Sequence, residues 1–157
     1  MSKLKTLEEL VLLRDEWRKQ GKKIVFTNGC FDLLHLGHIK LFKYAKQLGD
    51  ILIVGVNSDS SIKKIKGSKR PVFPLNERLE ILEAVEFIDY LTIFEEETPQ
   101  KLIAFLLPDI LVKGGDWKPE QVVGKREVEQ AGGKVIIFPY MKGYSSTNII
   151  EKIKKFF

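Results

Sequence analysis

The chain has 157 residues, of which 26 are basic and 21 acidic, so its formal net charge is +5. Its length predicts one domain, and a content of 44% hydrophobic and 30% charged residues excludes a disordered or fibrous chain. No apolar run approaches the about 20 residues of a membrane span, and a single cysteine, Cys30, cannot form an internal disulfide, so we expect a cytoplasmic protein without a membrane anchor. The positive charge indicates either nucleic acid or small phosphorylated ligands.

The first third of the chain predicts two helices and two strands. Thr6 opens a capping pattern, and apolar side chains then recur on one helical face until Gly21 ends the helix. Residues 24–27 predict a buried strand, and residues 37–48 predict a helix. Residues 51–56 are apolar on both faces, which is typical of a central strand in a parallel sheet.

The remainder of the chain continues this alternation. Residues 57–73 are polar and rich in lysine, so we expect them to form a loop outside the core. After this loop the pattern predicts, in chain order, a helix at 75–85, a strand at 90–94, a helix at 98–106, a strand at 109–113, a helix at 119–131, a strand at 134–138 and a final helix capped by Ser146.

Five strands that alternate with helices predict an α/β fold with an open, five-stranded parallel sheet, doubly wound and Rossmann-like. We expect one domain, 1–157, made of an N-terminal helix at 1–21 and an α/β core at 24–157. Ligands of such sheets bind beyond the carboxyl ends of the strands. The loops of interest are therefore those that follow the first, second, fourth and fifth strands: residues 28–36, 57–73, 114–118 and 139–145.

The loop after the first strand contains both histidines of the protein, His35 and His38. Residues three apart share a helical face, and a helix N-terminus attracts anions, so both imidazoles can contact one phosphate. Gly37 lets that phosphate approach the backbone. A purely structural pair is the alternative, whereas zinc is disfavoured because Cys30 and Asp32 lack the usual ligand spacing. The loop matches neither the dinucleotide-binding glycine pattern nor a Walker A sequence.

Two motifs carry a resemblance to a known family. Residues 29–38, with Gly29, Phe31, Asp32, His35, Gly37 and His38 in register, resemble the H-x-G-H signature of the cytidylyltransferase-like nucleotidyltransferases. Residues 144–150 resemble the second signature, I-S-S-T-x-x-I, with Tyr144 in place of the first isoleucine. The resemblance implies transfer of a nucleotidyl group from a nucleoside triphosphate to a phosphorylated acceptor, with release of pyrophosphate.

Within this superfamily, residues 27–152, including 66–72 and 113–117, resemble the adenylyltransferase domain of the ADP-heptose synthase family. That resemblance implies transfer of AMP from ATP to D-glycero-β-D-manno-heptose 1-phosphate, giving ADP-heptose for the lipopolysaccharide core. The chain has no room for the kinase domain of larger members, so it resembles a stand-alone transferase. Glycerol-3-phosphate cytidylyltransferase, which uses CTP, is the alternative, but Tyr140 stands where its motif has arginine.

The reaction brings two anions together, so we expect positioning and charge stabilisation to dominate catalysis. The predicted catalytic residues are His35, His38 and Lys46. The predicted nucleotide-binding residues are Thr27, Asn28, Gly29, Cys30, Phe31, Gly37, Lys113, Gly115, Asp116, Tyr144, Ser145, Ser146 and Thr147. The predicted acceptor-binding residues are Asp32, Asn57, Asp59, Lys64, Lys66, Arg70, Arg78 and Trp117. Asp32 could orient either a histidine or the acceptor.

We expect Mg²⁺ to arrive with ATP, because no dense carboxylate cluster is available to hold a metal by protein ligands alone. The expected partners are ATP and a sugar 1-phosphate, with no nucleic acid and no membrane, and the resemblance implies a homodimer. A basic nucleic-acid-binding module and a flavodoxin-like or receiver-like regulatory domain are the rival classes. The first lacks the sequence patterns of known nucleic-acid-binding modules.

Overall fold

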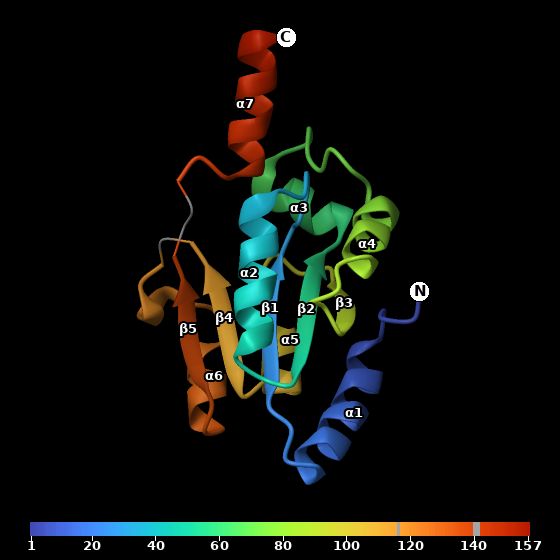
Figure 1. Cartoon of the computed structure of the whole chain (residues 1–157), viewed down its shortest axis with the longest axis vertical. Coiled ribbons are helices and arrows are strands. Elements are labelled where there is room, and N and C mark those ends of the chain that lie inside the picture. The colour runs from blue at the N-terminus through green and yellow to red at the C-terminus, as the bar shows by residue number, and fades with distance from the viewer. Residues whose placement is uncertain (116, 140–141) are drawn as a thin grey trace.

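The structure is a computed structural model that describes residues 1–115, 117–139 and 142–157. Within these residues, five strands form one parallel sheet in the order β3-β2-β1-β4-β5, which confirms the predicted Rossmann-like α/β fold (Figure 1). The strands are β1 Ile24–Gly29, β2 Ile51–Asn57, β3 Tyr90–Phe94, β4 Ile110–Gly114 and β5 Lys134–Phe138. The helices are α1 Leu7–Lys19, α2 Leu36–Gln47, α3 Asp59–Lys66, α4 Leu75–Glu83, α5 Gln100–Leu106, the short 3-10 helix η1 Pro119–Gln121, α6 Lys125–Gln130 and α7 Ser146–Phe156.

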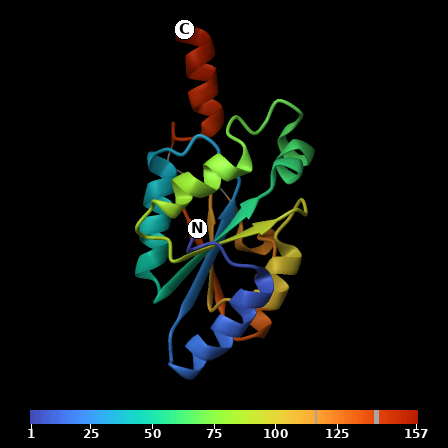
Figure 2. The same ribbon diagram turned by 90° about the vertical axis from the view of Figure 1, so that its right-hand side faces the viewer.

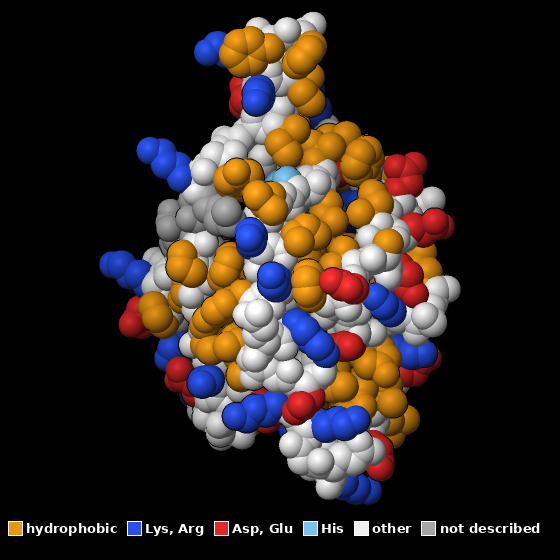
Figure 3. Space-filling model, in the orientation of Figure 1, with side chains coloured by type: hydrophobic (Ala, Val, Ile, Leu, Met, Phe, Trp, Pro, Cys, Tyr) orange, Lys and Arg blue, Asp and Glu red, His pale blue; other side chains and the backbone are white. Residues whose placement is uncertain are grey.

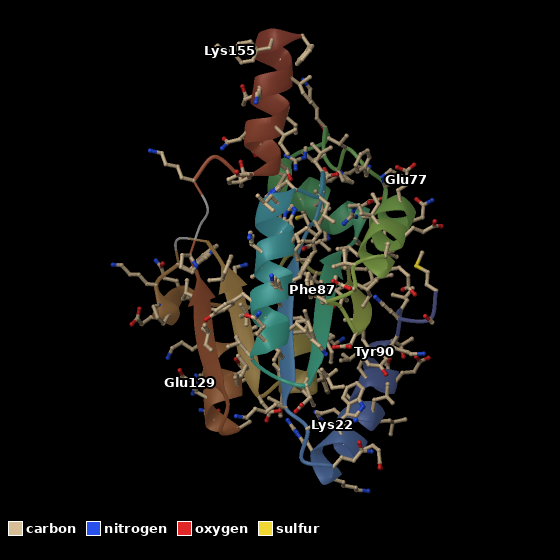
Figure 4. All side chains as sticks on the ribbon, in the orientation of Figure 1. Lys22, Glu77, Phe87, Tyr90, Glu129 and Lys155 are labelled. Carbon is tan, nitrogen blue, oxygen red and sulfur yellow. The ribbon has the colours of Figure 1, made fainter. Side chains whose placement is uncertain are left out.

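Helices cover both faces of the sheet because its central strands are apolar on both sides (Figure 2). Side chains alternate along β1: Val25 packs in the cluster with α2 and α4, and Phe26 packs in the cluster with α1, α5 and α6. Tyr90, at the start of β3, meets Trp17 of α1 with ring centroids 5.1 Å apart (Figure 4). These contacts hold each strand in position, and with it the loop that follows the strand.

The lysine-rich stretch after β2 was expected to be a loop, but its first half forms α3. Ser58 caps this helix by accepting a hydrogen bond from the backbone N–H of Ser61 at 3.1 Å. Ile62 is fully buried, while the lysines of the helix stay exposed. One buried turn is enough to stabilise α3, whose remaining surface is polar. The polar composition of this stretch therefore gave no indication of a helix.

The helix expected at 119–131 is interrupted. Gly124 has φ +90°, and a Cβ at this position would lie 2.6 Å from the Ile103 side chain of α5. The chain therefore turns at Gly124 and separates η1 from α6. This glycine is required both by its left-handed conformation and by its contact with α5.

The last helix, α7, begins at the carboxyl edge of the sheet and projects away from the body (Figures 1 and 2). Ser146, in its first turn, is the buried residue of this helix. Within the described residues, no helix combines the length and the apolar character needed to cross a bilayer.

Candidate active site

The loop after β1 places both histidines at the first turn of α2. His35 is the N-cap, and its Nδ1 accepts a hydrogen bond from the backbone N–H of Gly37 at 3.1 Å. The Nδ1 of His38 accepts a second one from the backbone N–H of His35, also at 3.1 Å. The two rings stack with their centroids 3.8 Å apart. Because each Nδ1 is an acceptor, each neutral ring carries its proton on Nε2.

Electrostatics favour this neutral form. Burial, together with smaller effects of the neighbouring His35 and Lys66, lowers the pKa of His38 to about 3, and the nearby Asp32 opposes this shift only weakly. Burial also lowers the pKa of His35. Near neutral pH the pair is therefore a set of two Nε2–H donors, not a pair of cations or general acids.

These histidines line a cavity of about 340 Å³ at the carboxyl edge of the sheet. The cavity lies beyond the carboxyl ends of the neighbouring strands β1 and β4, between which the strand order reverses, and ligands of open parallel sheets bind at such a point. Figure 3 shows a histidine surface, in pale blue, among hydrophobic surface at the foot of α7. The predicted site residues that line this first cavity are Asn28, Gly29, Cys30, Phe31, Asp32, His35, Gly37, His38, Lys66, Lys113, Gly115, Tyr144, Ser145, Ser146 and Thr147. Leu41, Gly114, Phe138 and Pro139 line it as well and were not predicted.

Two helix N-termini meet at the first cavity, those of α2 and α7. Ser145, and not Ser146 as predicted, caps α7 by accepting a hydrogen bond from the backbone N–H of Asn148 at 2.9 Å. Ser146 donates its hydroxyl hydrogen bond to the backbone carbonyl of Asp32, which ties α7 to the loop after β1. Each helix start contributes free N–H groups and about half a positive charge, so the cavity favours an anion.

Gly37 keeps the two walls of this cavity close together. A Cβ at position 37 would lie 2.9 Å from Cε1 of His35 and 3.2 Å from Cβ of Tyr144. Any side chain here would therefore push the imidazole wall away from the segment that leads into α7.

A second cavity, of about 440 Å³, adjoins the first. The two share a wall formed by residues at the ends of β1 and β4 and by α3: Asn28, Gly29, Cys30, Lys66 and Lys113. Lys113 holds its Nζ 5.1 Å from the centre of the Trp117 ring, and burial lowers its pKa. Trp117 and Asn57 line the second cavity, as do Glu97 and Thr98, which were not predicted.

Cys30 is half-buried in the shared wall. Burial raises the pKa of its thiol, and the nearby cations Lys66, Arg78 and Arg70 oppose that rise. A protonated thiol is a poor nucleophile, so the site is not built for covalent catalysis by this residue.

The carboxylate of Asp32 contacts the segment that precedes α4. It is 1% exposed and accepts hydrogen bonds from the backbone N–H groups of Val72 at 2.7 Å and Phe73 at 2.9 Å. It also pairs with Nε of Arg70 at 3.2 Å. Asp32 and Arg70 therefore anchor the loop that precedes α4 against the floor of the first cavity.

Arg78 and Asp59 were predicted to bind the acceptor, but they line neither cavity and pair with each other. Arg78 is 1% exposed and donates to the backbone carbonyls of Cys30 at 2.7 Å and Asn57 at 2.9 Å. Its Nη2 pairs with Asp59 at 2.8 Å, and its Nε donates to Phe73 at 3.1 Å. This guanidinium braces the loops behind the cavities, and its partners leave little of it for a ligand.

Three further predicted residues lie away from both cavities. Lys46 pairs with Asp89 at 2.6 Å at the opposite edge of the sheet, because α2 runs back from the carboxyl edge and rises about 12 Å between His38 and Lys46. The prediction that it faces the phosphates is therefore wrong. Thr27 is fully buried behind the cavities, and Lys64 is an exposed residue of α3 that lines neither. Asp116 and Tyr140 lie outside the described residues.

The carboxylates of the described residues offer little to a metal ion at this edge. Asp32 and Asp59 are both engaged by arginines, and no group of three metal-binding side chains occurs among residues 1–115, 117–139 and 142–157. A divalent ion at this site would have to take most of its ligands from a bound triphosphate and from water.

The chain is similar to several known proteins. Its residues 26–152 match the sequence profile described as cytidylyltransferase-like. It is 52% identical over 152 residues to the bifunctional protein HldE of Pelobacter propionicus and 53% identical over 150 residues to that of Escherichia coli. These matches cover 97% and 96% of this chain but 31% of each relative, so the chain spans about a third of their length.

Solved structures agree with the sequence relatives. A lipopolysaccharide core biosynthesis protein from Thermoplasma volcanium matches with a TM-score of 0.64 and 33% identity, over 80% of this chain and 100% of that one. A pantoate-β-alanine ligase from Francisella tularensis has the same TM-score at 20% identity, over 96% of this chain and 76% of that one, and shares the fold. Three observations lead to one assignment: the two histidines at the start of α2, the meeting of two helix starts, and the profile match over most of the chain. The chain belongs to the cytidylyltransferase-like family of nucleotidyltransferases.

Proposed function

We propose that this chain transfers the adenylyl group of ATP to a sugar 1-phosphate, D-glycero-β-D-manno-heptose 1-phosphate, and so forms ADP-heptose and pyrophosphate for lipopolysaccharide core synthesis. The likeness to the HldE proteins and to a lipopolysaccharide core biosynthesis protein supports this substrate pair. The match to HldE covers a third of those proteins, so the activity proposed is that of the matched region.

The observation that carries the proposal is the arrangement of His35 and His38. Both rings are held as Nε2–H donors on the wall of a cavity that two helix starts also face. A phosphate oxygen of the acceptor attacks the α-phosphorus of ATP and forms a new P–O bond. The bond from that phosphorus to the oxygen bridging to the β-phosphate breaks, and pyrophosphate leaves with this oxygen. Negative charge grows on the phosphoryl oxygens, where fixed donors stabilise the transition state.

Each of the two helix starts binds a different part of the triphosphate. The first turn of α2 carries the histidines, which suit the phosphorus under attack, and Ser145 and Thr147 at the start of α7 suit the departing β- and γ-phosphates. The acceptor oxygen is itself nucleophilic, so the protonated thiol of Cys30 is not needed. We propose that Mg²⁺ accompanies the triphosphate and neutralises part of its charge, held by phosphate oxygens and water.

We also propose that the protein acts in the cytoplasm as a homodimer and without nucleic acid. The exposed apolar side chains of α7 and of the residue after it support self-association, since Ile153, Phe156 and Phe157 are 51%, 62% and 99% exposed. Lys155, on the same helix, points away from the body (Figure 4). Analytical ultracentrifugation tests this: a monomer at micromolar concentration would rule the homodimer out.

A substrate matrix tests the proposed reaction. ATP, CTP and GTP are each combined with heptose 1-phosphate and glycerol 3-phosphate in the presence of Mg²⁺, and pyrophosphate release is measured. We expect the highest kcat/KM with ATP and heptose 1-phosphate, and no release without acceptor. A preference for CTP with glycerol 3-phosphate would reject the substrates but keep the reaction class, and release with no pair would reject both.

A further inference from the structure

Helix α7 is attached to the body through its first turn. Ser146 is the buried residue of the helix and donates its hydroxyl hydrogen bond to the backbone carbonyl of Asp32. Every residue from 151 to 157 is exposed, and the helix projects away from the body (Figures 1 and 2). The start of the same helix supplies Ser145, Ser146 and Thr147 to the lining of the first cavity. A contact that stabilises the rest of α7 therefore also stabilises one wall of this cavity.

The apolar side chains of α7 form one stripe that is symmetrical about Ile153. Ile150 and Phe156 lie three residues before and after Ile153, and Ile149 and Phe157 lie four residues before and after it. At about 3.6 residues per turn, these positions fall within about 120° of the helix circumference. Phe157 follows the helix but keeps its geometry, because its backbone N–H donates to the carbonyl of Ile153 at 2.9 Å. Figure 3 shows hydrophobic surface, in orange, along this projecting helix.

A stripe that reads the same in both directions is complementary to itself. Two antiparallel helices related by a two-fold axis bring each residue opposite the one that lies at the same distance beyond the axis. With the axis at Ile153, this residue faces its own counterpart, Ile150 faces Phe156 of the second copy, and Ile149 faces Phe157. Neither a lipid surface nor an unrelated protein requires such symmetry, so the pattern favours a second copy of this chain.

The area of the stripe is sufficient for such a pair. A fully exposed phenylalanine removes about 150–250 Å² from water when it is buried. Phe156 and Phe157 are 62% and 99% exposed, so in two copies they remove about 500–800 Å² together. The isoleucines of the stripe bring the total to about 1,000 Å², which is the lower limit for a specific interface.

Two lysines flank the stripe. Lys152 and Lys154 lie about 100° to either side of Ile153, so two-fold pairing places each lysine on the same side as its counterpart in the second copy. Their aliphatic stems can cover the edge of the stripe while the ammonium groups stay in water. Because like charges oppose association, salt should strengthen the dimer by screening them. An anionic membrane or an acidic protein would instead lose affinity in salt.

We propose that α7 pairs with α7 of a second copy in an antiparallel arrangement centred on Ile153, and that this pairing stabilises the helix start at the first cavity. Phe157 of the second copy then lies beside Ile149, which is about 6 Å along the helix axis from Ser145. The second copy thus supports the turn whose hydroxyl groups suit the β- and γ-phosphates. This inference rests on the homodimer and the ATP site of the proposed function, and it adds the surface that forms the dimer.

Cysteine crosslinking tests the pairing and its direction. In a Cys30→Ser background, Ile153→Cys, Ile150→Cys and Phe156→Cys are made singly and oxidised with diamide. We expect a crosslinked dimer from Ile153→Cys alone, and from Ile150→Cys only when it is mixed with Phe156→Cys. Glu151→Cys lies on the opposite face of the helix and should give no crosslink. Crosslinking of Ile150→Cys with itself would overturn the antiparallel arrangement, and no crosslink at position 153 would overturn the interface.

A pair of serine variants tests the effect on the site. Ile153→Ser removes the centre of the stripe, and Glu151→Ser places the same side chain on the opposite face. Analytical ultracentrifugation gives the dimer Kd, and pyrophosphate release gives the KM of ATP at a protein concentration where the wild type is dimeric. We expect Ile153→Ser to raise the dimer Kd about 100-fold and the KM of ATP about fivefold or more. Glu151→Ser should match the wild type.

The outcomes separate this inference from the proposed function. A monomeric wild type rejects the homodimer and the pairing, while transfer of AMP is measured independently of both. A dimer that survives Ile153→Ser keeps the homodimer but overturns the α7 interface, and loss of the dimer with an unchanged KM of ATP overturns the effect on the first cavity. If monomers bind phosphatidylglycerol vesicles through α7, or if salt dissociates the dimer, the pairing is overturned. If no substrates react, the function fails and the crosslinks still decide the pairing.

Discussion

The two ends of helix α2 have different roles. Its first turn holds His35 and His38 at the first cavity, with each Nδ1 occupied by a backbone N–H. Its last turn holds Lys46, whose Nζ donates to Asp89 and to the backbone carbonyl of Asp50, each at 2.6 Å. Both ends carry nitrogen donors, but one set points to a ligand site and the other closes the opposite edge of the sheet.

This difference follows from the direction of the chain. A helix that connects two parallel strands must run back from the carboxyl edge to the amino edge, so its first turn alone reaches the ligand. Between the ends, Leu41, Phe42 and Ala45 are buried in the core and hold the helix in place. The contrast predicts that substitutions at the start change catalysis, whereas those at the end change stability.

The largest effect is expected for His38→Ala. Loss of one preorganised donor should lower kcat about 10²–10³-fold, while the melting temperature changes by no more than a few degrees. Pyrophosphate release and thermal unfolding give the two values. His38→Gln is the matched control, because its amide Nε2 is a neutral donor at a similar distance, and it should retain more activity than alanine. Full activity in the alanine variant would remove His38 from the mechanism.

A smaller effect is expected on the pH dependence of stability. Between pH 6.5 and about 3 the unfolded chain protonates His38 and the folded chain does not. The free energy of unfolding should therefore fall as the pH drops below about 6.5, by at most about 2 kcal/mol from this residue at pH 5, and be unaffected by it above pH 6.5. Urea denaturation at pH 7.5 and 5.0 measures the loss, and His38→Gln should show less of it. An equal loss in the variant would assign the effect to other groups.

The smallest effect is expected for Lys46→Ala. Its ion pair with Asp89 is about one-third exposed on each side, at 32% and 30%, so its loss should cost about 1 kcal/mol in the free energy of unfolding. The kcat should stay at the wild-type value, because the cavities lie at the other edge. A fall in kcat of tenfold or more without loss of stability would contradict the division between the two ends.

The strands were the most predictable part of the fold. Runs such as residues 51–56 are apolar on both faces, and this pattern predicts a buried strand whatever the details of tertiary packing. Helices that are short or held by few contacts were less predictable. Ile62 alone gives no periodicity that would indicate α3, and the break at Gly124 depends on Ile103, which is 21 positions away in sequence.

The candidate site shows the same difference between residues placed by local sequence and residues placed by long-range contacts. The motif predicted that His35, Gly37 and His38 lie together at a helix start, which local sequence determines, and the structure places them at the start of α2. Arg78 was misplaced because its partners, Cys30 and Asn57, lie at the ends of two different strands, which only the folded sheet brings together. Glu97, which lines the second cavity, was missed for a different reason: a run of three glutamates is typical of an exposed loop, although strand direction places the loop after β3 at the ligand edge.

Gly37 has a consequence for how this scaffold can diversify. Because the backbone at that position lies against both His35 and Tyr144, the width of the first cavity is set by main-chain contacts that few substitutions can adjust. The second cavity is bounded instead by side chains, among them Glu97 and Trp117, that can be exchanged one at a time. The shape of the second cavity should therefore change more readily, in selection or engineering, than the width of the first cavity.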